Sequence, residues 1–115
     1  MKLVTKKIEE RFKKFPLYSQ DGKGKQALCL AKFFLCLGAW TWYILEANVD
    51  EGIAYGIVIS QNGEGEYSYI NLSELQGLRT RMGLTVERDL FFEPERISLI
   101  DDPYLQKFLK KMYDK

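Results

Sequence analysis

A mostly apolar run from Ala27 to Leu45 restricts how this chain can fold. Lys32, Gly38 and Thr41 interrupt the run, and many of its residues are aromatic. A membrane-spanning helix needs about 20 consecutive, predominantly apolar residues, so the interruptions favour buried β-strands over a membrane span. Because 46% of the 115 residues are hydrophobic, we expect a single domain, residues 1–115, built around one well-filled core.

Five strands are predicted from this run and from the alternating segments that follow it. The run turns at Gly38, and the later strands are separated by short polar turns such as "NGEG". Strands that follow one another through short turns pair in antiparallel order. The predicted strands cover residues 26–37, 39–47, 53–61, 66–71 and 84–92. The predicted fold class is α+β, with an antiparallel meander of about five strands.

Three helices are expected to pack against that sheet. Thr5 is a suitable N-cap for an amphipathic first helix. Asn71 caps a short internal helix, whose apolar stripe reaches Met82. Asp102, followed by a proline, opens a C-terminal helix over about residues 102–113.

The cysteines and the missing histidines exclude several kinds of chemistry. Cys29 and Cys36 are seven residues apart, on opposite faces of one extended strand, so we expect buried reduced thiols and no disulfide. Two thiols without any histidine cannot complete a tetrahedral zinc site. Ser-His and Cys-His catalysis are excluded as well. We predict no metal and no cofactor, and an enzyme would depend on carboxylates, lysine, tyrosine or an oxygen-ligated metal.

Charge is distributed unevenly along the chain. Residues 1–32 carry nine basic and three acidic groups, whereas residues 46–102 carry four basic and twelve acidic groups. The two regions present either ordinary solvated faces or two oppositely charged surfaces. The candidate acidic surface comprises Glu64, Glu66, Glu87, Asp89, Glu93 and Glu95.

The loop "YSQDGKGKQ" is a candidate contact site because Gly22, Lys23, Gly24 and Lys25 follow one another in it. It does not have the spacing of a Walker P-loop. It also joins a helix to a strand, whereas a dinucleotide fingerprint joins a strand to a helix. Its glycines permit positive φ, so backbone amides and lysines could converge on an anion. The alternative is a plain turn.

The segment "GAWTWYILE" supplies a candidate aromatic surface. Simple alternation places Trp40, Trp42 and Glu46 on one face of the strand and Tyr43 on the other. We expect the two tryptophans to belong to the core and Tyr43 to be the more exposed ring. If one face is open, the aromatic rings form a stacking platform for nucleic acid or a hot spot for a protein partner.

The segment "VERDL" carries a pair of carboxylates. Glu87 and Asp89 lie on the same face of the predicted strand, about 7 Å apart by strand geometry. This spacing suits glycoside chemistry or an oxygen-ligated metal, although solvated charges are common on half-exposed strands. Arg88, on the apolar face, needs an acidic partner such as Glu46 or Glu74.

Several segments together resemble one bacterial family: "MKLVTKKIEERF", "PLYSQDGKGKQALCLAKFF", "GAWTWYILEAN", "AYGIVIS" and "INLSELQGLRTRMGLTVERDLFFEP". The sequence is similar to the domain of unknown function family 2958 from Met1 to about Pro94. Members commonly read "RGPLGL" where this chain has "RTRMGL". The family's members are about 100 residues long, lie on plasmids, conjugative elements and phages, and often neighbour conjugation and antirestriction genes. The resemblance brings no catalytic residue, substrate or cofactor.

These observations favour a cytoplasmic, non-catalytic interaction protein of a mobile element that binds a host protein, in a counter-defence or accessory role. The cytoplasm is expected because the N-terminal segment becomes charged where a signal peptide would be apolar. The acidic surface could compete for a basic nucleic-acid groove on the partner. The alternative is a single-stranded nucleic-acid binder that uses Lys23, Lys25, Tyr43 and the basic first helix. An enzyme built on Glu87 and Asp89 is the least favoured.

Overall fold

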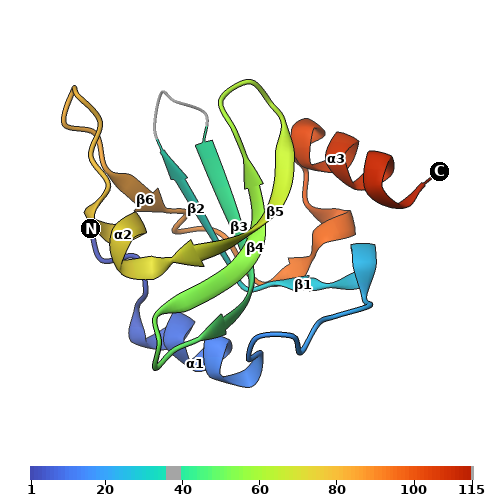
Figure 1. Ribbon diagram of the computed structural model, residues 1–115, viewed down its shortest axis with the longest axis horizontal. Helices are drawn as coiled ribbons and strands as arrows, with labels where there is room; N and C mark the ends of the chain where they lie inside the picture. The colour runs from blue at the N-terminus through green and yellow to red at the C-terminus, as the bar shows by residue number, and fades with distance from the viewer. Residues whose placement is uncertain (36–39, 115) are drawn as a thin grey trace.

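The computed structural model describes residues 1–35 and 40–114 and confirms the α+β class (Figure 1). The central element is a five-stranded antiparallel sheet with the strand order β5-β4-β3-β2-β6. Four strands form a meander, and the fifth returns to pair with β2. The strands are β2 (Ala31–Leu35), β3 (Trp40–Asn48), β4 (Ile53–Ile59), β5 (Gly65–Asn71) and β6 (Val86–Arg88).

The three expected helices are present and begin at the expected caps. They are α1 (Lys6–Lys14), α2 (Leu72–Gly77) and α3 (Pro103–Tyr113), with short 3₁₀ helices η1 (Gly24–Gln26) and η2 (Ile97–Leu99) between them. Thr5, Asn71 and Asp102 each accept a hydrogen bond from a first-turn backbone N–H. None of the helices in the described ranges is long and apolar enough to cross a membrane.

The internal helix is shorter than predicted. It ends at Gly77 because Leu78 adopts an extended conformation. The next residues form a tight loop, in which the Thr80 N–H donates to the carbonyl of Leu84 and Gly83 has a φ of 81°. Met82, predicted to continue the apolar stripe, is 82% exposed in this loop, so that prediction is wrong.

The predicted first strand is divided in two. Its beginning forms β1 (Leu28–Cys29), which pairs with the two-residue strand β7 (Glu95–Arg96) in a second, separate sheet. Its continuation is β2, and the predicted turn at Gly38 lies outside the described residues. Cys29 is a free, fully buried thiol, and burial raises its pKa. Cys36 also lies outside the described residues.

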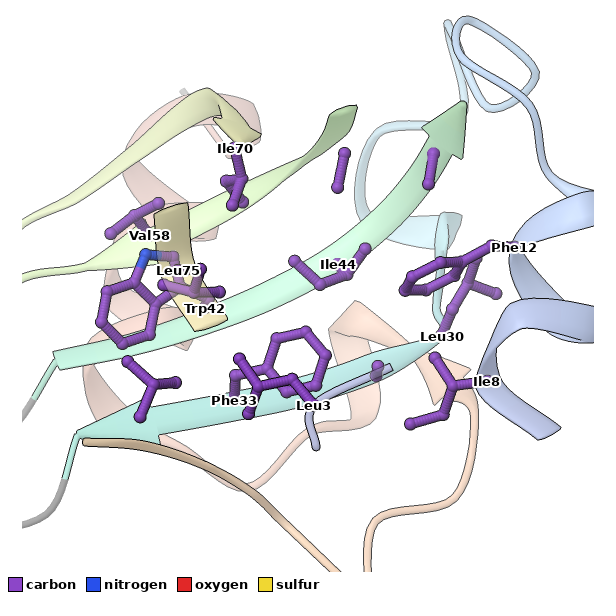
Figure 2. Packing of buried hydrophobic residues seen from close by; sticks show 14 of the residues in the cluster. Leu3, Ile8, Phe12, Leu30, Phe33, Trp42, Ile44, Val58, Ile70 and Leu75 are labelled. Atoms are coloured by element: carbon purple, nitrogen blue, oxygen red, sulfur yellow. The ribbon is translucent and has the colours of Figure 1, made fainter. Parts of the chain in front are cut away.

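Both faces of the large sheet are covered, so the molecule has three layers. Figure 2 shows the first core, where Ile8 and Phe12 from α1 and Leu75 from α2 pack on one face. The second core lies on the opposite face, against η2 and α3, and includes Leu105 and Leu109 of α3. Alternate residues of β3 enter the two cores, as strand geometry requires.

A β-bulge in β3 changes which residues share a face. The pairing with β4 shifts between Ile44 and Glu46, so that Glu46 lies opposite Tyr55 and joins the α3 side of the sheet. Simple alternation had placed Glu46 beside the tryptophans, and that prediction is wrong. Gly56 lies opposite Ile44, where a Cβ atom would be 1.9 Å from the carbonyl oxygen of Tyr43. The bulged pair therefore needs glycine at position 56.

Candidate functional site

A cavity of about 720 Å³ opens beside the edge strand β6. We call it the β6 groove. Its wall is mainly apolar, and several charged side chains from β2 and the β6 segment surround it. The residues used below are Lys32, Phe34, Trp40, Glu87, Asp89, Leu90 and Phe91.

The groove exists because α3 covers only the β5 end of the sheet face on which it packs. The rings of Tyr104 and Phe108 lie over Gly63 and Gly65, where a Cβ atom would come within 2.6 and 2.7 Å of them. In Figure 1, α3 therefore lies beside β5, on the opposite side of the picture from β6. Phe34 of β2, opposite Glu87 of β6, remains only half-buried at the other end.

Two neighbouring apolar side chains project at the rim of the groove. Leu90 is 62% exposed and Phe91 is 92% exposed. They lie outside β6 because the Asp89 carboxylate accepts a hydrogen bond from the Phe91 N–H at 3.0 Å and turns the chain. The predicted strand over 84–92 is therefore wrong at both ends: the strand spans only Val86–Arg88.

The charged residues around the groove are partly paired. Lys32 Nζ lies 3.6 Å from Asp89 Oδ2 and 5.9 Å from the centre of the Tyr43 ring. Arg88 donates from its guanidinium to the carbonyl of Lys2, so the prediction of Glu46 or Glu74 as its partner is wrong. Among residues 1–35 and 40–114, Glu87 has no ion pair within 4.0 Å. It is the groove's available negative charge.

The six residues of the candidate acidic surface lie in several places. Glu87 and Asp89 line the β6 groove, and Glu93 pairs with Arg11 at 3.6 Å. Glu95 belongs to β7. Glu64 and Glu66 line a different cavity of about 360 Å³ at the β4–β5 hairpin. Among the described lining residues, Trp40 is the one that lines both cavities.

The aromatic residues are arranged differently from the prediction. Trp42 is buried, as expected, and stacks on the half-buried Trp40 with 6.1 Å between ring centroids. Tyr43 has no exposed surface, and its hydroxyl donates to Asp102 Oδ2 at 2.6 Å. Burial raises the Tyr43 pKa, and the Asp102 carboxylate raises it further. The prediction of an exposed Tyr43 is wrong because η2 and α3 cover its side of the sheet.

The loop "YSQDGKGKQ", residues 18–26, is called the glycine loop below. Its glycines have the left-handed backbone that the sequence indicates. Gly22 has a φ of 80° and Gly24 a φ of 52°. Lys25 Nζ lies 2.6 Å from Asp114 Oδ1 at the end of α3, and Lys23 is exposed. The loop thus presents one lysine to solvent and uses the other to contact α3.

Two residues hold this loop: Glu46, which the sequence suggested only as a partner of Arg88, and Gln20, which it did not single out. The buried Glu46 carboxylate accepts from the backbone N–H groups of Tyr18, at 2.8 Å, and Gln20, at 2.7 Å. The Gln20 amide donates to the carbonyls of Leu28 and Leu45 and accepts from the Leu28 N–H. We call this arrangement the Gln20–Glu46 network. A glutamate inside an otherwise apolar strand was the sequence signal for it.

No metal centre is apparent among the described residues: no group of three or more cysteine, aspartate or glutamate side chains there could hold an ion. Asp89 is instead engaged by Lys32 and by a backbone N–H.

Comparison with known proteins identifies the family. The chain belongs to the family described as protein of unknown function (DUF2958), whose model matches residues 3–101. The predicted resemblance is confirmed, and the match extends beyond Pro94 to the residues just before α3. No curated protein and no solved structure matches the chain.

Proposed function

We propose that the protein is a non-catalytic binding factor of a bacterial mobile element and that its β6 groove recognises a segment of a host protein. The observation that carries this proposal is the combination of a cavity of about 720 Å³ with Leu90 and Phe91 exposed at its rim. Adjacent exposed apolar side chains beside a cavity favour a protein-interaction site. The mobile-element setting follows from the family resemblance.

The groove also defines the chemistry of the segment it would bind. An apolar side chain of the partner would enter between Phe34 and Phe91 and remove apolar surface from water. A lysine or arginine next to that side chain would pair with Glu87, since the other carboxylate of the groove, Asp89, is already paired with Lys32. The partner segment is therefore apolar and basic, and its binding weakens as salt rises.

The carboxylates of the groove support binding more than catalysis. Asp89 turns the chain through the Phe91 N–H and pairs with Lys32. Glycoside hydrolysis needs two carboxyl groups with separate acid and base or nucleophile roles. With Asp89 held in a structural role, Glu87 is the one carboxylate of the described groove lining that is left for such a role.

The second candidate function is single-stranded nucleic-acid binding, with Tyr18 and Tyr69 in place of the buried Tyr43 as stacking rings. Tyr18 is 63% exposed, belongs to the loop that carries Lys23, and shares a hydroxyl hydrogen bond of 3.0 Å with Tyr69. Exposed rings beside a cationic loop are a typical stacking platform. A gel-shift titration tests this alternative: oligonucleotide binding that falls with salt and is lost in Tyr18→Ala supports it.

Peptide selection from a random library tests the groove. Selected peptides should carry an aromatic or branched apolar residue next to lysine or arginine. The Phe91→Ser variant should bind them at least about 10-fold more weakly, as loss of an interface aromatic commonly causes. Glu87→Gln should bind them more weakly and with less salt dependence.

The matched control is Leu99→Ser, since Leu99 is 68% exposed and does not line the groove. Equal losses in Phe91→Ser and Leu99→Ser would refute the groove as the binding site. Peptides without a basic residue would refute the role of Glu87.

A further inference from the structure

A third cavity, of about 310 Å³, lies between the glycine loop, the sheet and the C-terminal end of α3. None of its described lining residues lines the β6 groove. Three tyrosines, Tyr55, Tyr67 and Tyr113, contribute to its lining, together with two acidic residues, Asp21 and Glu46. We call it the tyrosine pocket.

The tyrosine rings are held in place by one another. Tyr55 stacks on Tyr67 with 5.9 Å between centroids and an angle of 9° between the planes. The hydroxyls of Tyr67 and Tyr113 are hydrogen-bonded to each other. The Tyr113 ring also lies against Gly24, where a Cβ atom would be 3.5 Å from it. The rings come from β4, β5 and α3, so the folded chain assembles the pocket in advance of any ligand.

The only charged side chains that line the described pocket are acidic. Glu46 is 3% exposed and uses its two oxygens to accept the N–H groups of Tyr18 and Gln20. No ion pair of Glu46 or Asp21 within 4.0 Å is formed among residues 1–35 and 40–114. A carboxylate offers about four acceptor positions, so Glu46 retains acceptor capacity.

Neither lysine of the loop lines the pocket: Lys25 pairs with Asp114, and Lys23 is exposed to solvent. The pKa of Tyr55 is raised by burial and by the negative charges of Glu46 and Asp21. The negative charges of both carboxylates thus reach the Tyr55 ring, which forms part of the pocket wall.

We propose that the tyrosine pocket binds an organic cation of the alkylammonium class. Aromatic rings attract such cations electrostatically, and the buried Glu46 carboxylate, which lines the pocket, adds to this attraction. Anionic ligands such as phosphate are disfavoured because both charged groups lining the pocket are acidic. The cation could be a free small molecule or the methylated lysine side chain of another protein, since both present the same group.

Choline and its neutral isostere 3,3-dimethylbutan-1-ol form a matched pair of probes, because the isostere replaces the quaternary nitrogen by carbon. In an NMR titration of the full chain, choline should shift the ring resonances of Tyr55 and Tyr67. The isostere should bind at least about 10-fold more weakly. Equal binding of the two compounds, or shifts confined to other parts of the chain, would overturn the proposal. A peptide with trimethyllysine that binds more tightly than choline identifies a protein as the source of the cation.

Two substitutions locate the site without disturbing the Gln20–Glu46 network. Asp21→Asn removes a charge at an exposed position and should weaken choline binding by about 3- to 10-fold. Tyr55→Leu should weaken it by about 10-fold. Asp101→Asn is the matched control, since Asp101 is exposed and outside the pocket.

If Asp21→Asn and Asp101→Asn bind choline equally, the pocket is not the site. Phe91→Ser should retain choline binding, so failure of this proposal and failure of the β6 groove are distinguishable.

Discussion

The Gln20–Glu46 network and the β6 groove differ in which kind of side chain is buried. In the network, a carboxylate and an amide are buried, and together they make five hydrogen bonds with the backbone. In the groove, Glu87 is partly exposed and Phe91 is 92% exposed. Polar groups lie inside in the first region, and apolar groups lie outside in the second.

This difference separates residues that hold the fold from residues that are available for contact. A buried carboxylate is tolerated only when hydrogen bonds replace water, so removing it leaves backbone donors without partners. An exposed phenylalanine contributes little to folding, and its burial against a partner can contribute to binding. Substitutions in the network should therefore lower stability, whereas substitutions in the groove should weaken partner binding and change stability little.

Replacing Glu46 tests the comparison with the largest expected effect. Glu46→Leu leaves the buried N–H of Gln20 and the partly buried N–H of Tyr18 without acceptors, and should lower the free energy of unfolding by about 3–5 kcal/mol. Urea denaturation followed by circular dichroism measures this change. Glu87→Leu, the matched substitution in the groove, should change stability by about 0.5 kcal/mol or less. Similar losses in both variants would contradict the distinction between the two regions.

Tyr43 lies on β3 between the two regions. The pH dependence of the stability that its hydroxyl contributes is a second test of the comparison. Tyr43→Phe leaves Asp102 Oδ2 without this donor and should cost about 1–1.5 kcal/mol near neutral pH. The Tyr43 pKa is raised in the folded state, so the unfolded chain, with a tyrosine pKa of about 10, loses its proton first. The stabilisation is fully present below pH 10 and is lost as pH rises towards the folded-state pKa.

The measurement is the difference in unfolding free energy between wild type and Tyr43→Phe from pH 8 to 11. This difference in unfolding free energy should decrease by about 1.4 kcal/mol per pH unit above pH 10. Tyr104→Phe controls for loss of a hydroxyl at an exposed position. A difference that stays constant up to pH 11 would show that the buried hydroxyl is not protected from ionisation.

Much of the fold could be predicted because its signals are local. Thr5, Asn71 and Asp102 are recognisable as caps from their neighbours, and each one caps the expected helix. The strands β4 and β5 follow from alternation and from the turn between them. These elements depend on residues close in sequence, which periodicity describes well.

The errors arise where distant parts of the chain determine local structure. The bulge after Ile44 moves Glu46 to the other face, and only the pairing with β4 reveals it. Tyr43 is buried by α3, which lies about 60 residues away in sequence. Leu90 and Phe91 were assigned to a strand, although the Asp89 side chain turns the chain before them. The loop lysines could be proposed as a contact site from the sequence, whereas the β6 groove required the tertiary structure.

The smallest expected effect concerns the loop that the network supports. Lys23 is exposed, and Lys25 forms an ion pair with Asp114 near the C-terminal end of α3. Exposed ion pairs contribute about 0–1 kcal/mol, so replacing both lysines by alanine should lower the free energy of unfolding by about 0.5 kcal/mol or less. Urea denaturation of the double variant beside Glu46→Leu measures both effects under one condition. The small loss should disappear in high salt, because only a screened surface pair is removed. A loss above about 2 kcal/mol would place the lysines with Glu46 among the residues that hold the loop, and the contact role of Lys23 would then have to be abandoned.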